Sequence, residues 1–189
     1  MRLAVATALG AWLAVAAPSA QSNMAQPEKY TAFAVDTSIT ARGVKTSPVD
    51  ITINRWSTDA ERDQLLSVFR QKGQDGLLEA LQKLPVVGYI NTPGSLKYDL
   101  HFARQRPEVD GGKMVFLMTD RYIGAWEAVN RPRTIDYPFM LIQLQVDKDG
   151  SGMGKASIYT KITEAKDGTI ELENFSNQPV SLNQIRRVR

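Results

Sequence analysis

The sequence contains no cysteine and only one histidine, His101, among its 189 residues. Without cysteine the chain cannot form disulfides, use a thiol nucleophile or bind a metal through thiolates. With one histidine it lacks the usual multi-histidine zinc site of metalloenzymes. The chain also has no G-x-S-x-G segment, which is the signature of the nucleophile in α/β-hydrolases. These absences remove most familiar signs of catalysis.

A strong charge excess is missing as well. The chain has 23 Lys and Arg against 20 Asp and Glu, and no basic helix is interleaved with aromatic residues, so we expect no nucleic-acid partner. The "GSGMG" segment, residues 150–154, precedes an expected strand, whereas the glycine-rich phosphate-binding motif requires a helix. We therefore expect no cofactor.

The one long apolar run lies at the N-terminus. Arg2 is followed by a run from Leu3 to Ala17 and then by small residues, which predicts a secretory signal peptide over residues 1–20. The run is short for a membrane span, so we expect no stable membrane insertion after cleavage. The sequence predicts an exported protein, periplasmic or extracellular, with a flexible mature N-terminus (21–28) and one domain (29–189).

Alternation of apolar and polar residues dominates the domain and predicts about nine strands. They are expected at residues 29–35, 48–56, 86–90, 96–104, 113–119, 139–146, 155–163, 169–175 and 180–188. Short connections between the later strands favour antiparallel pairing. The expected fold is α+β: a mostly antiparallel sheet, either a sandwich or an open barrel, with an inserted helical hairpin.

The helical hairpin is predicted from two segments of helical periodicity, residues 57–73 and 74–84. Thr58 and Glu61 form a capping box at the start. Gly73 is a natural end for the first helix, and Pro85 stops the second.

Two small groups of side chains suggest a catalytic pair and a metal-binding turn. His101 and Asp99 are two residues apart on one expected strand, where the carboxylate could orient the imidazole for acid–base catalysis; a solvated polar face gives the same pattern. Asp147, Asp149 and Ser151 resemble the first half of an EF-hand loop, but Ile158 stands where the loop needs glutamate, which leaves a calcium-binding turn of another kind as the metal hypothesis. A glycine-rich hairpin turn whose Asp side chains accept from backbone amides explains the second pattern without a metal.

The connection "TDRYIGAWEAVNRPRTIDYPF", residues 119–139, is long for a link between strands, and such loops are often functional. Its two prolines restrict the residues before them. Arginine forks and aromatic faces within it could bind an anionic or sugar-like ligand. The candidate ligand-binding residues are Trp126, Glu127, Asn130, Arg131, Arg133 and Tyr137. The alternative is structural: Trp126 covers the open end of the sheet, while an arginine pairs with Glu127, Asp120 or Asp136.

Three stretches, "RWSTDAERDQLL", "EAVNRPRTIDYPF" and "TIELENFSNQPVSL", resemble a family of uncharacterised secreted bacterial proteins. The resemblance runs from about Ile51 to the C-terminus. It implies export and bacterial origin and brings no activity, cofactor or catalytic residue with it.

Three functional hypotheses follow. The first is a non-enzymatic module that binds a small molecule or a protein partner through the 119–138 loop. The second is an enzyme that acts on a polar substrate through His101 and Asp99. The third is a structural or assembly protein that offers an apolar patch or a sheet edge to a partner.

Overall fold

The computed structural model describes residues 27–37, 43–94, 97–121, 123, 129–130, 132–175 and 178–188. The expected signal peptide lies outside these residues, as do residues 21–26 of the expected flexible N-terminus. Glu28, which the sequence predicts to belong to that flexible segment, instead begins the first strand and is buried.

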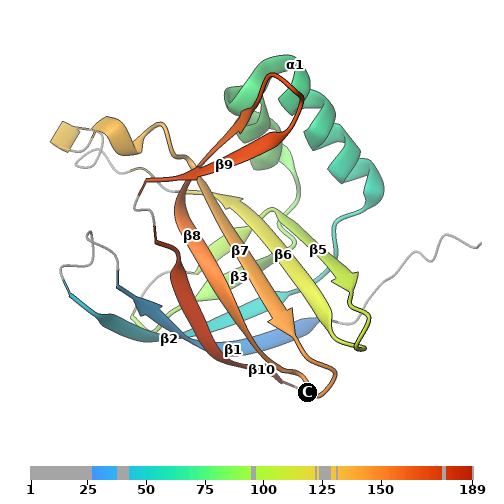
Figure 1. The fold of residues 1–189 in the computed structure, drawn as a ribbon, viewed down its shortest axis with the longest axis vertical. Coiled ribbons are helices and arrows are strands. Elements are labelled where there is room, and N and C mark those ends of the chain that lie inside the picture. Colours follow the sequence, from blue (N-terminus) through green and yellow to red (C-terminus); the bar gives the residue numbers. More distant parts are fainter. Residues whose placement is uncertain are drawn as a thin grey trace, which may run out of the picture.

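The described chain forms a ten-stranded antiparallel sheet, shown in Figure 1. The strands follow the order β4-β3-β2-β1-β10-β8-β7-β6-β5, and β9 pairs with β8 outside this path. Their bounds are β1 Glu28–Asp36, β2 Lys45–Ile53, β3 Gly88–Asn91, β4 Tyr98–Leu100, β5 Phe102–Pro107, β6 Lys113–Asp120, β7 Phe139–Val146, β8 Ser151–Glu164, β9 Ile170–Asn174 and β10 Val180–Val188. The predicted sheet-dominated α+β class is confirmed.

The sheet curls into a nearly closed barrel because its two end strands are neighbours in the chain. β4 and β5 were expected as one strand, but they are separated at His101 and pair with opposite ends of the sheet, β3 and β6. Across this seam the hydroxyl of Thr119 donates to the carbonyl of Asp99 at 2.7 Å. Closure leaves few unpaired strand edges.

The helical segment is one kinked helix, and the expected helical hairpin is not shown. α1 spans Asp59–Lys83 and starts with the predicted capping box between Thr58 and Glu61. Gly73 interrupts the helical geometry with a φ of +66°, a value that glycine adopts readily. The residue expected to end the first helix therefore bends a longer helix.

α1 covers the outside of the barrel at one end, as Figure 1 shows. Its buried leucine and phenylalanine side chains pack with residues on the outer faces of β5 to β8. This outer cluster comprises Leu65, Phe69, Leu77 and Leu81 of the helix, together with Phe102, Met118, Phe139 and Ile162 of the strands. The barrel interior holds a second apolar cluster, to which β1, β2, β6, β7 and β10 all contribute.

One end of the interior is closed by charged and aromatic side chains. The ammonium of Lys113 donates to both carboxylate oxygens of buried Glu28, at 2.8 and 2.6 Å, and the hydroxyl of Tyr30 donates to the same carboxylate. Lys113 also lies 5.4 Å from the ring centroid of Trp56, and Arg187 is 3.3 Å from Glu28. Because the charges are paired and hydrogen-bonded, they can occupy the end of an apolar core. We call this group the polar end of the barrel.

Replacing Lys113 with Met should destabilise the fold by about 3 kcal/mol, because it leaves the buried carboxylate of Glu28 without its main partner. Urea denaturation of the purified protein measures the change. Lys29→Met on the exposed face of β1 is the matched control, and its effect should stay within about 0.5 kcal/mol. Equal stability of the two variants would show that the polar end contributes little.

Candidate functional site

The end of the barrel opposite the polar end contains an apolar cavity of about 320 Å³. Inward-facing side chains from seven strands line it, together with Thr92 just after β3. They are Ala34, Val49, Ile90, Thr92, Tyr98, Met140, Ile142, Ala156, Ile158, Val180 and Leu182. Most of them belong to the interior cluster or pack against it. The cavity is therefore the unfilled mouth of the barrel, and we call it the mouth cavity.

The period of two along each strand determines which residues reach this cavity. On β7, Met140 and Ile142 line it, while Leu141 and Gln143 between and after them line a groove on the outer face. On β8, Ala156 and Ile158 point inward and Ser157 points outward. Alanine at positions 34 and 156 leaves space that a larger side chain would fill.

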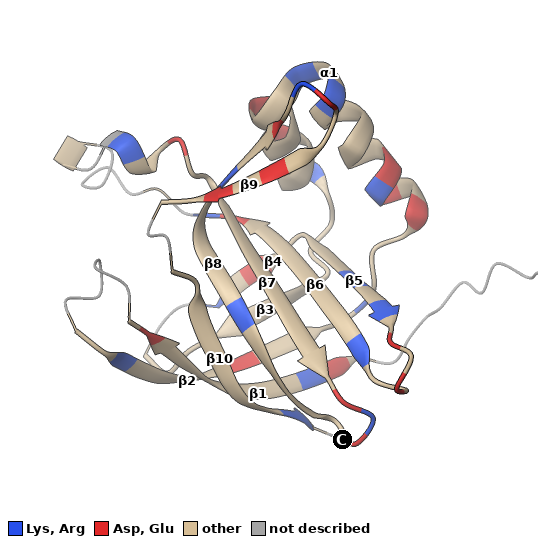
Figure 2. Cartoon of the chain, in the orientation of Figure 1, with Lys and Arg blue, Asp and Glu red and all other residues tan. Residues whose placement is uncertain are grey.

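The chemistry of the mouth cavity is almost wholly hydrocarbon. None of the residues lining it is charged, and only Thr92 and Tyr98 among them carry hydroxyl groups. Figure 2 shows that acidic and basic residues are instead spread over the strands, turns and helix in a mixed pattern. A pocket of this volume with an apolar lining and a few hydroxyl groups fits a small organic molecule.

The predicted binding residues of the 119–138 loop are only partly within the described structure. Trp126, Glu127 and Arg131 lie outside the described residues, while Asn130 and Arg133 are exposed. Tyr137 donates a hydrogen bond of 2.6 Å to the carboxylate of Glu173, and this bond raises the pKa of the tyrosine. Its ring also meets Phe175 edge-on at 5.3 Å. Tyr137 thus links the loop to the end of β9.

Arg121 holds the described part of this loop, a role that the sequence reasoning missed. Its guanidinium donates to the carbonyls of Thr134 and Tyr137 at 2.8 and 3.2 Å and stacks over the ring of Tyr159 at 4.4 Å. The side chain is buried. Pairing of an arginine with Glu127, Asp120 or Asp136 stays a prediction, because Glu127 and Arg131 lie outside the described residues.

The candidate catalytic pair does not share one strand face, because the chain bends at His101. Nδ1 of His101 lies 3.0 Å from the carbonyl of Leu84, so this nitrogen carries the proton and donates. Nε2 lies 3.9 Å from the carboxylate of Asp120, whereas Asp99 is exposed. His101 connects the end of the helix to the barrel seam, and it does not line the mouth cavity. Catalysis through this pair stays a prediction.

The candidate metal-binding turn is a tight connection between β7 and β8. The carboxylate of Asp149 accepts from the backbone amide and the hydroxyl of Ser151 at 2.9 and 2.7 Å, and these bonds lower the pKa of Asp149. Within the described ranges, no group of three or more metal-binding side chains is close enough to hold an ion. Through these hydrogen bonds Asp149 stabilises the turn.

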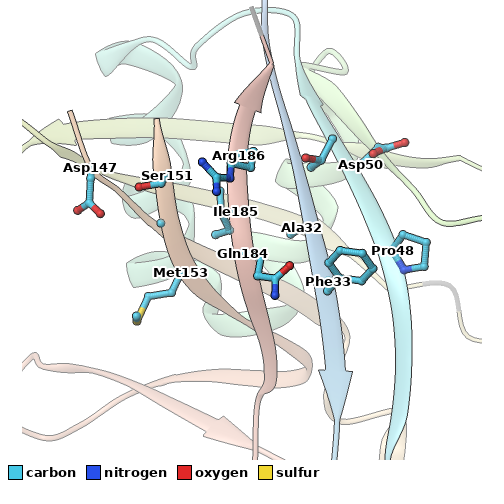
Figure 3. A pocket seen from close by; sticks show the side chains of 12 residues that line it. Ala32, Phe33, Pro48, Asp50, Asp147, Ser151, Met153, Gln184, Ile185 and Arg186 are labelled. Atoms are coloured by element: carbon cyan, nitrogen blue, oxygen red, sulfur yellow. The ribbon is translucent and has the colours of Figure 1, made fainter. Parts of the chain in front are cut away.

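A second hollow, of about 590 Å³, lies on the outer face of β1, β2, β8 and β10. Figure 3 shows Gln184 at its centre, between Phe33 and Met153. The pairings of β10 with β1 and β8 both shift register next to Gln184, and its φ is +53°. One sheet face surrounds a ligand less completely than a barrel interior does, and Phe33 and Met153 are 50% and 65% exposed. The mouth cavity is therefore the better candidate site.

Arg121→Lys should open the loop, because a lysine cannot donate to two carbonyls in the fixed geometry of a guanidinium. We expect a loss of about 2 kcal/mol in stability and faster amide exchange at Tyr137, whose N–H bonds to the carbonyl of Thr134 at 3.1 Å. Hydrogen exchange followed by NMR measures this. Arg133→Lys, in the exposed part of the same loop, should leave exchange unchanged. Unaltered protection in Arg121→Lys would refute the assigned role.

Gln184→Gly should stabilise the protein by about 0.5–1 kcal/mol, since glycine tolerates a positive φ that costs other residues energy. Asn183→Gly, one residue earlier and also exposed, should instead destabilise by about the same amount. Thermal unfolding of both variants compares the two positions. A loss of stability in both would mean that the bulge carries no backbone strain.

Comparison with protein families, curated proteins and solved structures found no match. Within the described part of the chain, no helix is long and apolar enough to cross a membrane. The assignment of a function therefore rests on the geometry of the chain itself.

Proposed function

We propose that the protein is a non-enzymatic binding module that holds an apolar small molecule in the mouth of its barrel. The mouth cavity carries this proposal: an apolar space of about 320 Å³ at one end of an otherwise filled interior. Barrels of eight or more strands commonly enclose one small ligand in this way. Two hydroxyl-bearing residues in an apolar wall suit orientation of a ligand better than reaction with it.

The proposal moves the binding surface from the 119–138 loop to the barrel interior. The loop's part is to hold the start of β7, where buried Phe139 packs against the helix and Met140 lines the cavity. The hydrogen bonds of Arg121 and Tyr137 are consistent with a loop that holds the start of β7 in place. Figure 1 shows the short helix within the loop, η2 (Pro132–Thr134), on the same side of the barrel as the turned ends of β1 and β2.

Ala156→Phe should weaken binding of a neutral apolar probe, because the new ring would occupy the mouth cavity. Ser157→Phe introduces the same ring on the outer face of the same strand and should leave binding unchanged. The fluorescence of 1-naphthol, titrated with each protein, measures the affinity. We expect a loss of at least about tenfold, or about 1.4 kcal/mol, in Ala156→Phe alone.

A folding defect in Ala156→Phe would obscure this result, so Ala34→Phe provides a second test at the partly exposed rim of the cavity. Its control is Val35→Phe, the next residue along β1. Methyl NMR shifts of Met140, Val180 and Leu182 on addition of 1-naphthol locate the bound probe. No binding by the wild-type protein, or binding that survives both cavity-filling substitutions, would contradict the proposal.

A further inference from the structure

The lining of the mouth cavity restricts the charge of what it can hold. No ionised side chain borders the cavity, and the charges of the polar end are already paired with one another. Transfer of an unpaired carboxylate or ammonium into such surroundings costs several kcal/mol. A ligand whose charge had to enter the barrel would therefore bind poorly.

The interior below the cavity restricts its length. Ile51, Val115 and Leu144 of the interior cluster are fully buried and do not line the cavity. An apolar cavity of about 150 Å³ accommodates benzene, so about 320 Å³ has room for roughly a dozen carbon and oxygen atoms. The space suits one short chain or a small ring system and excludes a long acyl chain.

The two hydroxyl-bearing residues lie close together along the chain, at one edge of the barrel. Thr92 follows β3 and Tyr98 begins β4, its antiparallel neighbour. A hydroxyl group can accept more than one hydrogen bond while it donates another, so both can add a bond to those that they already make. The opposite wall, formed by Ala156, Val180 and Leu182, offers only hydrocarbon.

Resting on the proposed function, the geometry points to an uncharged amphiphile of about a dozen heavy atoms as the ligand class. Its hydrocarbon part occupies the mouth cavity, and its single hydroxyl or carbonyl end lies at the Thr92–Tyr98 edge. Short-chain alcohols, esters and small phenols have this chemistry; ionised fatty acids and amines do not.

Three ligands of equal chain length test the charge restriction on the wild-type protein: 1-octanol, octanoate and octylammonium at pH 7, each displacing bound 1-naphthol. The uncharged alcohol should bind at least about tenfold more tightly than either ion, a difference of about 1.4 kcal/mol. Equal binding by an ion would overturn the inference. So would binding of 1-naphthol that none of the three displaces. Failure of 1-naphthol itself to bind would instead overturn the proposed function.

The position of the ligand's hydroxyl or carbonyl group is tested by Tyr98→Phe, which removes the hydroxyl of the side chain and keeps the ring. This substitution should weaken 1-octanol several-fold and leave the hydrocarbon naphthalene unchanged, as measured by the same displacement. Tyr89→Phe, on the neighbouring strand and outside the mouth cavity, is the matched control and should affect neither ligand. Equal losses for 1-octanol and naphthalene in Tyr98→Phe would show that the tyrosine contributes packing rather than a hydrogen bond, which would overturn the proposed orientation.

Discussion

The structure depends on a single constraint: residues 98–107 provide both end strands of the sheet. β4 pairs with β3, β5 pairs with β6, and only His101 separates them. Leu100 and Phe102 would share a face of a regular strand, but the bend sends Leu100 into the barrel interior and Phe102 into the cluster beneath the helix. The bend is held by the bond from His101 to Leu84 and by that from Thr119 to Asp99. The sheet has an enclosed interior because β4 and β5 meet at this seam.

The two ends of the closed interior differ in the side chains that occupy them. Along β1, the inward positions run from Glu28 and Tyr30 at the polar end to Ala34 at the mouth. Lys113 of β6 pairs with Val146 of β7 at the polar end. The start of β7 lies at the mouth, where Met140 lines the cavity. Large and charged side chains fill one end through hydrogen bonds, while alanines leave the other open. The open mouth, where we propose the ligand site, follows from this change in side-chain size.

Much of the fold could be predicted because its signals are local. The bounds of β7 and β10 match the predicted segments residue for residue, and the capping box places the start of the helix. The break at His101 and the kink at Gly73 could not be predicted, because a continuous alternation and a helix-ending glycine are each compatible with two geometries. Nor could the candidate site: alternation shows which residues share a face, but not which strands meet across a barrel. Arg121 was missed because the carbonyls of Thr134 and Tyr137, to which it donates, are backbone groups and leave no mark in the sequence.

The position of the candidate site away from the stabilising contacts has an energetic consequence. The paired charges of the polar end, the seam and the hydrogen bonds of Arg121 all lie outside the mouth cavity. Apolar surface left exposed at the mouth costs about 25 cal/mol for each Å², and an uncharged ligand would remove that surface from water without disturbing any of these contacts. A ligand that bound only the folded chain would raise the free energy of unfolding, by an amount that grows with its concentration relative to its Kd. The barrel can therefore tolerate an open apolar mouth, because the polar end, the seam and the hydrogen bonds of Arg121 stabilise the rest of the fold.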